Sequence, residues 1–398
     1  MIISKPPENK QVTVKPFDPQ KGELINKLLK NRITPEELDR LRRCPVTADD
    51  LSDIIQHIYD LNEKYILELS RVEGLLRKLD DIKNRRRNKF FIKKIKSMSS
   101  NNGKKFKVIL AEGDSWFNYP LILTDIIDRI SMENDFAVYS LASGGDWLLN
   151  MLTARHYVEE LSILHPDVFL ISGGGNDLVG SRRLAAVIDT LAGNEFHQNK
   201  WAEDLIKNAK TDIIPLNMDD FTEGVKYLSK DFFALVMFFY LQYSFLISGI
   251  LNGGKFPNIQ IITQGYDYPI PSYNKGSFRL LHWYVPFVRN FLGHGSWLKT
   301  PLLIRGITNP ELQRKILYAM IYLFNEMMIQ VGYLFNETFP GQVFHIDSRG
   351  SVGNNGWTDE LHPLPKHFIK TGEVFVHCIR KDLPATFDHT YVVGKISS

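Results

Sequence analysis

One serine lies where the sequence pattern favours a nucleophile. Ser115 follows an apolar run that ends in Gly113 and Asp114, and an expected helix follows it. The change of period predicts a strand that leads into a helix at Ser115. The free N–H groups and positive dipole end of a helix stabilise negative charge that develops near a serine oxygen. A serine at a helix start is also a common N-cap, and both interpretations stay open on this motif alone.

A candidate base lies near the C-terminus. Asp359 precedes His362 by three residues in a segment bounded by glycine and prolines. In such a turn the carboxylate can fix the tautomer of the imidazole while the other ring nitrogen faces Ser115. Serine is a weak nucleophile near neutral pH and needs a base to remove its proton as it attacks. A solvated aspartate and an unrelated histidine are the alternative interpretation.

Two glycine-rich segments supply candidate donors for an oxyanion. In the first, Gly144 and Gly145 precede Asp146, and Gly145 would let the backbone approach a ligand and offer its N–H. In the second, three glycines precede Asn176, whose amide can donate to an oxyanion. Glycine pairs also make ordinary turns. A phosphate loop is the rival interpretation of the second segment, but the spacing of the known phosphate-loop motifs is missing.

The elements that must position these residues are buried strands that alternate with helices. The strand pattern occurs in residues 106–110, 136–141, 168–172, 259–263 and 343–346. Alternating strands and helices predict a parallel sheet that is covered on both faces. Function in such sheets gathers at the carboxyl ends of the strands, where the motifs fall.

Together the four motifs resemble those of the SGNH (GDSL-like) hydrolases in order and spacing: Gly-Asp-Ser, then glycine, then Gly-x-Asn-Asp, then Asp-x-x-His. The resemblance implies an α/β fold, a flavodoxin-like three-layer α/β/α sandwich, here with a five-stranded parallel sheet. It implies a triad of Ser115 as nucleophile, Asp359 and His362. It also implies an oxyanion hole from the N–H groups of Ser115 and Gly145 and the side chain of Asn176.

Two positions depart from the family pattern. Trp116 stands where the name-giving motif has leucine, which makes the expected cleft more aromatic. Gly144 and Gly145 are adjacent, and Gly145 is preferred as the donor because the family glycine commonly precedes an aspartate. The resemblance extends over about residues 104–377.

Three regions are predicted along the chain: a helical region with a basic run in residues 1–100, a hydrolase domain in 104–385 and a tail in 386–398. Residues 49–81 carry leucine and isoleucine at helical spacing, and their stripe is expected to pack on another helix of the chain, on the hydrolase domain or on a second copy. The basic run of residues 83–96 is either a solvated helix face or a surface for anionic lipid.

The composition limits the partners. The 48 Lys and Arg are nearly matched by 45 Asp and Glu, so the net charge of +3 does not indicate a nucleic-acid partner. Cys44 and Cys378 lack the spacing of a disulfide framework or a zinc site. No metal or organic cofactor is expected for the triad. The first residues lack a secretory pattern, so a cytoplasmic location is expected, with membrane association as the alternative.

Aromatic and apolar segments bear on the substrate. Residues 232–250 are almost uninterrupted apolar sequence, expected to form a core or substrate-facing helix, with membrane contact as the alternative. Aromatic residues within 266–273 and 278–304 would wall an acyl pocket, form a lid or add to the core. The predicted function is hydrolysis of a carboxylic ester, an acyl ester or lipid with phospholipid included, through an acyl-enzyme. The alternatives are an acyltransferase with the same triad and a membrane- or partner-binding module.

Overall fold

The structure, a computed structural model, describes residue 23 and residues 82–97, 106–119, 124–179, 183–193, 195–271 and 297–396. The chain divides into two units, Met1–Arg71 and Val72–Ser398, and all the elements below lie in the second. The predicted helix of residues 49–81 and most of the aromatic segment 278–304 lie outside the described residues.

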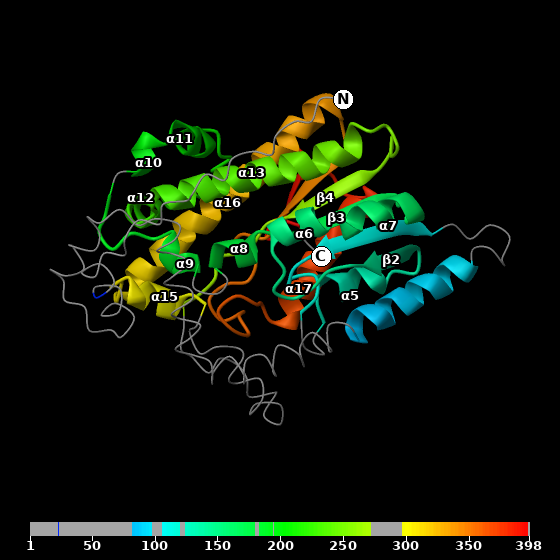
Figure 1. Cartoon of the computed structure of the whole chain (residues 1–398), viewed down its shortest axis with the longest axis horizontal. Coiled ribbons are helices and arrows are strands. Elements are labelled where there is room, and N and C mark those ends of the chain that lie inside the picture. The colour runs from blue at the N-terminus through cyan, green and yellow to red at the C-terminus, as the bar shows by residue number, and fades with distance from the viewer. Residues whose placement is uncertain are drawn as a thin grey trace, which may run out of the picture. The chain divides into compact units, whose positions relative to one another are not determined.

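A parallel sheet forms the centre of the second unit (Figure 1). Its strands are β1 (Lys107–Gly113), β2 (Phe136–Ser140), β3 (Val168–Ser172), β4 (Gln260–Gln264), β5 (Val343–Asp347) and β6 (Thr390–Val392). They lie in the order β2-β1-β3-β4-β5-β6, and every neighbouring pair is parallel. The predicted α/β class is confirmed, but the prediction of five strands is wrong because the sheet has six.

The additional strand lies within residues 386–398, which the sequence pattern assigned to a tail. β6 pairs His345 with Thr390 and Asp347 with Val392, and all three of its residues are buried. Three residues are too few to produce a periodic hydrophobic pattern, so the strand is visible only through its pairing with β5.

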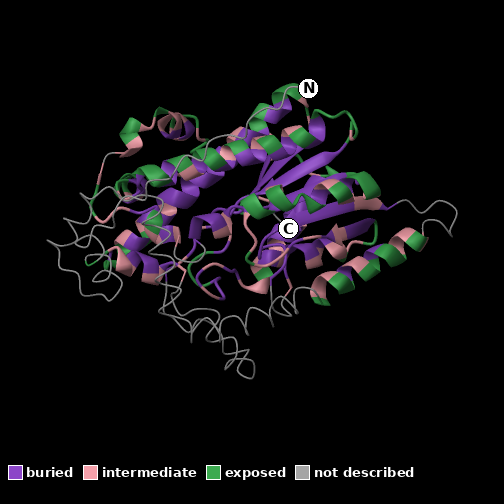
Figure 2. Ribbon diagram, in the orientation of Figure 1, coloured by how far each residue is buried: buried purple, intermediate pink, exposed green. Residues whose placement is uncertain are grey.

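Helices cover both faces of the sheet. The helices α5 (Ile126–Ser131) and α17 (Pro365–Arg380) pack on one another and cover one face. The other face is covered by α6 (Leu148–Ala154), α7 (His156–Leu164), α13 (Lys230–Leu251) and α16 (Pro310–Thr338). Figure 2 shows the strands as almost wholly buried, as expected for a parallel sheet between two helical layers.

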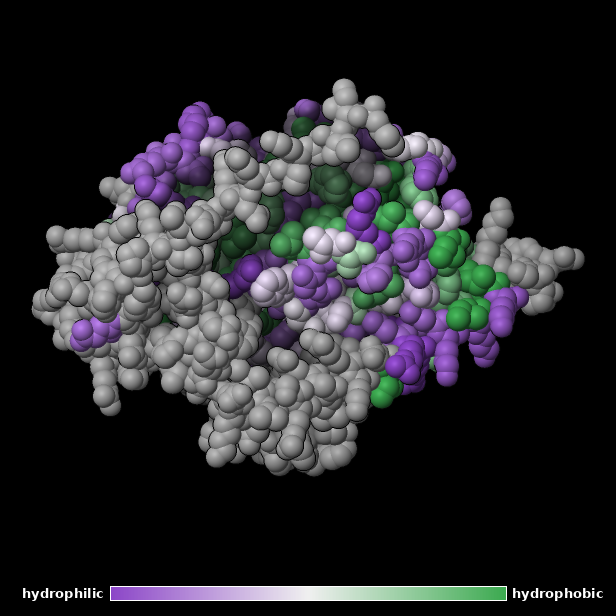
Figure 3. All heavy atoms as spheres, in the orientation of Figure 1, coloured by the Kyte–Doolittle hydropathy of each residue, from purple (hydrophilic) through white to green (hydrophobic). Residues whose placement is uncertain are grey.

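Shorter helices complete the described part of the unit: α8 (Gly175–Val179), α9 (Arg183–Ala186), α10 (Glu195–Gln198), α11 (Lys200–Lys207), α12 (Met218–Val225) and α15 (Lys299–Ile304). In the face that Figure 3 shows, hydrophilic side chains gather over α10 and α11, whereas hydrophobic side chains reach the surface around α7. Ile163 of α7 is 70% exposed, so part of the apolar surface of this helix is left in contact with water.

The long apolar helix α13 has two different faces. One face packs on α16 and α6, and there the Tyr243 hydroxyl donates to the carbonyl of Gly173 at 2.8 Å. The other face exposes Phe238, Leu241 and Phe245. By length and composition α13 is apolar enough to cross a membrane, and 44% of its most apolar window is buried in the protein. The inward face matches the expected core helix, and membrane contact by the outward face stays a prediction.

Residues 82–97 form a helix within the basic run, and two of its basic side chains form ion pairs inside the protein. Arg87 is 6% exposed, and its Nη2 lies 2.6 Å from both carboxylate oxygens of Asp125 and 2.7 Å from Asp128. Lys83 joins the same carboxylates, at 2.5 Å from Asp125 and 3.1 Å from Asp128. Asp125 is also the N-cap of α5, so this ion cluster fixes the start of that helix.

The opposite face of this helix is exposed at Arg86, Lys89, Phe90 and Lys93. The inward cations of the basic run pair with Asp125 and Asp128, which neither interpretation of this segment predicted. Lipid contact by the outward cations stays a prediction.

Candidate active site

Ser115 lies just beyond the carboxyl end of β1, in a tight turn. The backbone N–H groups of Phe117 and Asn118 donate to the carbonyl of Asp114 at 3.1 and 3.0 Å. The carboxylate of Asp114 accepts from the N–H of Trp116 at 3.0 Å. The expectation that Ser115 starts a helix is wrong, because the Asp114 side chain closes the turn locally and α5 begins only at Ile126. Stabilisation by a helix dipole therefore does not apply to Ser115.

The structure brings the three predicted triad residues together. Nε2 of His362 lies 2.8 Å from Oγ of Ser115. Nδ1 of His362 lies 2.8 and 3.0 Å from the two carboxylate oxygens of Asp359. With the ring proton on Nδ1 and donated to Asp359, Nε2 accepts the hydroxyl proton of Ser115. The arrangement is a hydrogen-bonded chain from hydroxyl to imidazole to carboxylate, which can activate a serine.

A short turn after β5 holds the aspartate and the histidine in register. One oxygen of Asp359 accepts from the N–H groups of Leu361 and His362, both at 2.8 Å. Thr358 donates its N–H to the carbonyl of His362 at 2.8 Å. Both triad members lie in one closed turn, so local hydrogen bonds set much of their relative position.

The neighbouring Glu360 connects this turn to α15. Its carboxylate accepts from the N–H groups of Trp297, Leu298 and Lys299 at 3.0, 3.1 and 2.9 Å. Glu360 is 3% exposed, so the three bonds compensate the burial of its charge. They also place the Trp297 ring against the His362 ring, with centroids 6.0 Å apart.

Tyr119 supports the triad from the other side and was not assigned a role from the sequence. Its hydroxyl donates to Asp359 at 3.3 Å, and its ring lies 4.6 Å from that of His362. Burial and the nearby Asp359 charge raise the pKa of Tyr119 well above its ordinary value, so the hydroxyl stays a donor. Tyr119 belongs to the Ser115 motif, but no spacing signal links it to a residue 240 positions away.

The predicted oxyanion donors follow the carboxyl ends of three neighbouring strands, β1, β2 and β3. The N–H groups of Ser115 and Gly145 have no acceptor among the described residues, so both are available to a ligand. Gly145 has a φ of 80°, a conformation that favours glycine, and it is exposed. Nδ2 of Asn176 donates to the carbonyl of Asp146 at 3.0 Å, which holds the amide beside the Gly145 loop.

Tyr266, at the end of β4, ties the nucleophile turn to the glycine-rich loop. Its hydroxyl donates to Asp114 at 2.6 Å and accepts from the N–H of Gly175 at 3.1 Å. A Cβ at Gly175 would lie 2.9 Å from the Tyr266 ring, so only glycine allows this approach. From the sequence, Tyr266 is only part of an aromatic segment, because its partners Asp114 and Gly175 follow two other strands.

Burial changes the acidity of two carboxyl groups at the end of β1. Burial raises the pKa of Glu112 to about 8, and the charge of Asp146 adds to the effect. Burial also raises the pKa of Asp114 to about 6, although hydrogen bonds from Tyr266 and Trp116 oppose the shift. At neutral pH the neutral form of Glu112 is therefore favoured, which limits the negative charge that is buried near Asp146.

The described residues include no cluster of three or more His, Cys, Asp or Glu side chains placed to hold a metal ion. In this part of the chain, the polar groups around Ser115 are the hydroxyl, imidazole, carboxylate and amide groups described above.

Replacing Asn176 with alanine is expected to lower kcat by roughly 10²–10³ with little change in KM, because an oxyanion donor acts mainly in the transition state. Steady-state kinetics on a soluble ester test this. Asn150→Ala, which removes an exposed amide that donates to Asp146 at 3.1 Å, is the matched control and should leave kcat unchanged. An unchanged kcat in Asn176→Ala would remove this residue from the oxyanion hole.

The chain matches no protein-family model and no curated protein. Among solved structures it is similar to a GDSL-like lipase from Bacteroides thetaiotaomicron, at 12% identity over 74% of this chain and 98% of that chain, with a TM-score of 0.31. It is also similar to an acetyl xylan esterase from Geobacillus stearothermophilus, at 13% identity over 56% of this chain and 97% of that one, with a TM-score of 0.21.

Proposed function

We propose that this protein hydrolyses carboxylic esters through an acyl-enzyme on Ser115. The observation that carries the proposal is the hydrogen-bonded chain from Ser115 Oγ through His362 to Asp359, with distances of 2.8 Å at both links. A serine hydroxyl, an imidazole and a carboxylate in this order are the parts needed for nucleophilic acyl transfer.

In the first half of the reaction, Ser115 Oγ attacks the carbonyl carbon and its proton passes to Nε2 of His362. Asp359 holds the imidazole and stabilises the imidazolium that forms. The negative charge on the carbonyl oxygen is met by the N–H groups of Ser115 and Gly145 and by the amide of Asn176. The bond to the leaving oxygen then breaks, and His362 returns the proton to that oxygen, which releases an alcohol.

In the second half, water takes the place of the alcohol. His362 removes a proton from the water as its oxygen attacks the acyl carbon. The second tetrahedral species collapses, the bond to Ser115 Oγ breaks, and the proton on His362 passes to Ser115. The products are a carboxylic acid and the free enzyme, and no atom is oxidised or reduced.

Two finer points belong to the same proposal. If an alcohol replaces water in the second half, the enzyme is an acyltransferase, because only the acceptor differs. The aromatic segments, the apolar segment of residues 232–250 and the basic run favour a lipid substrate, phospholipid included. Most of the aromatic segment 278–304 lies outside the described residues, and Lys83 and Arg87 of the basic run pair with Asp125. Location, self-association and membrane contact stay predictions.

A fluorophosphonate probe tests the nucleophile directly. Intact-protein mass spectrometry should show one added phosphonyl group on the full chain, and peptide mapping should place it on Ser115. Pre-incubation with an ester should slow the labelling. A probe that labels a different residue, or that labels heat-unfolded protein equally fast, would contradict a serine activated by the folded site.

A further inference from the structure

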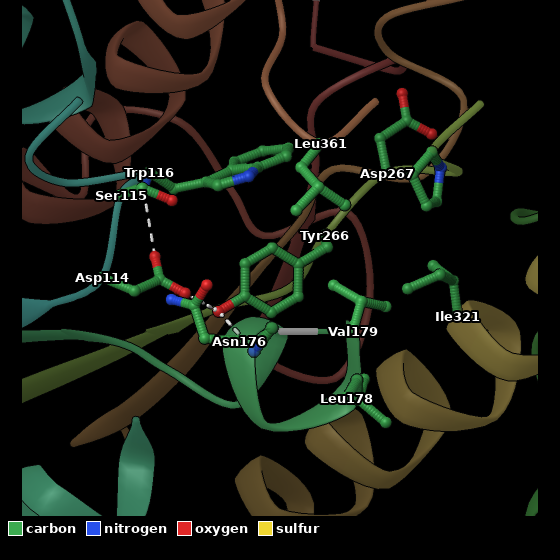
Figure 4. A pocket seen from close by; sticks show the side chains of 12 residues that line it. Asp114, Ser115, Trp116, Asn176, Leu178, Val179, Tyr266, Asp267, Ile321 and Leu361 are labelled. Atoms are coloured by element: carbon green, nitrogen blue, oxygen red, sulfur yellow. Dashed lines mark hydrogen bonds between the residues drawn. The ribbon is translucent and has the colours of Figure 1, made fainter. Parts of the chain in front are cut away.

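A small pocket lies beside the nucleophile. It is lined by the nucleophile and oxyanion segments at one end and by apolar side chains from α8, α16 and the turn of His362 elsewhere. The described lining residues are Asp114, Ser115, Trp116, Gly175, Asn176, Leu178, Val179, Tyr266, Asp267, Pro269, Ile321 and Leu361. In Figure 4, Ser115 and Asp114 lie at one end, Val179 and Ile321 lie toward the other, and Tyr266 lies between them.

The positions of His362 and Asn176 decide which end of an ester enters this pocket. His362 must protonate the leaving oxygen, so the alcohol part of the ester has to lie on the His362 side of Ser115. His362 is not among the described residues that line the pocket, whereas Ser115 and Asn176 are. A carbonyl held at Ser115 and Asn176 with its alcohol toward His362 directs its acyl chain into the pocket.

The pocket is too small to enclose a long chain. Its volume is about 40 Å³. On the same measure one water needs about 10–15 Å³, so the space equals about three waters. An acyl group of about two to four carbons fits such a space. Asp267 is the polar side chain toward the far end of the described lining, and its carboxylate accepts from the N–H groups of Gly350 and Val352, both at 2.6 Å.

The walls are fixed by packing. The Tyr266 ring contacts Trp116 on one side and Phe324 on the other, with centroids 5.4 and 5.5 Å apart. Its hydroxyl is held by Asp114 and by the N–H of Gly175. Ile321 and Val179 are 4% and 6% exposed. Close-packed walls of this kind resist the entry of additional methylene groups.

We propose that this pocket is the acyl subsite and that it restricts the enzyme to esters of short acyl groups, acetyl to butyryl. The inference rests on the proposed function and deepens it by naming the acyl class. It disfavours the long-chain lipid that the sequence pattern suggested.

The test uses p-nitrophenyl acetate, butyrate and octanoate with the full chain. We expect kcat/KM for acetate or butyrate to exceed that for octanoate at least about tenfold, since each methylene group without space costs about that much or more. Ile321→Ala should raise the ratio of octanoate to acetate about tenfold by opening the end of the pocket. Val179→Ala, on a different element, provides a second test if the first variant folds poorly.

Ile316→Ala is the matched control, because Ile316 is a fully buried residue of the same helix that does not line the pocket. It should lower the melting temperature but leave the ratio unchanged. A wild-type enzyme that cleaves octanoate as fast as acetate overturns the acyl inference and leaves ester hydrolysis standing. An unchanged ratio in both folded pocket variants also overturns it. A protein that cleaves none of the esters and resists fluorophosphonate fails at the proposed function instead.

Discussion

Ser115→Ala is expected to lower kcat for a soluble ester by roughly 10⁶, to the background left by binding and oxyanion stabilisation. The variant loses the oxygen that attacks the carbonyl carbon, and His362 loses the hydroxyl that it activates. Stability should change little, because Ser115 contributes one side-chain hydrogen bond, that to His362. Steady-state kinetics and thermal melting measure the two effects separately.

Ser162→Ala is the control for this change. Ser162 Oγ donates to the carbonyl of Val158 at 3.0 Å on the exposed side of α7, outside the four motifs. It should retain full activity. If Ser115→Ala keeps more than about a hundredth of the wild-type kcat, in a preparation shown to be free of contaminating esterase, Ser115 is not the nucleophile.

Asp359→Asn should lower kcat about 10⁴-fold near neutral pH while leaving the fold intact. The carboxylate accepts the Nδ1 proton of His362, whereas an asparagine amide can donate to Nδ1 and so move the proton to Nε2. His362 would then present a donor to Ser115 and could not remove its proton. The measurement is kcat between about pH 6 and 8, with a melting curve as the check on folding.

A second carboxylate–imidazole pair in the protein provides the comparison. Asp382 accepts from Nδ1 of His377 at 2.8 Å on the surface of α17. Asp382→Asn makes the same chemical change outside the site and should leave kcat unaltered. A loss of less than tenfold in Asp359→Asn would mean that the aspartate does not set the tautomer of His362, and Tyr119 and Trp297 alone would have to orient the ring.

The sequence predicts those parts of the site that depend on short spacings. Asp359 and His362 are three residues apart, and one closed turn is enough to join them. Strand β3 lies at residues 168–172, where the sequence predicts it. A short, unbroken apolar run between polar turns is typical of a buried strand. Ser115, Gly145 and Asn176 were placed by following strands to their ends, since parallel strands share one edge for their carboxyl ends.

The parts that were missed depend on contacts between distant segments or on competition among local bonds. Tyr266 and Asp114 are 152 residues apart in the sequence, so neither hydrophobic periodicity nor a sequence motif predicts their contact. The change from strand to helix periodicity predicts a helix start at Ser115. In the structure the Asp114 carboxylate accepts from the N–H of Trp116, and the segment forms a turn. In both cases a single polar side chain decides the local geometry, and hydrophobic periodicity carries no information about its partner.

The ion cluster around Arg87 determines where this protein can be divided. A fragment that starts after residue 97 would lack both the helix that covers Asp125 and the guanidinium that pairs with it, and removing one member of a buried ion pair typically costs about 3–5 kcal/mol. That is a large share of the 5–15 kcal/mol that stabilises an ordinary domain. The damage would reach the catalytic segment, since Asp125 also accepts the N–H of Tyr119 at 3.1 Å. The smallest fragment that can fold with this site intact therefore starts before Lys83. A recombination event or an engineered fusion has to join the chain upstream of that residue.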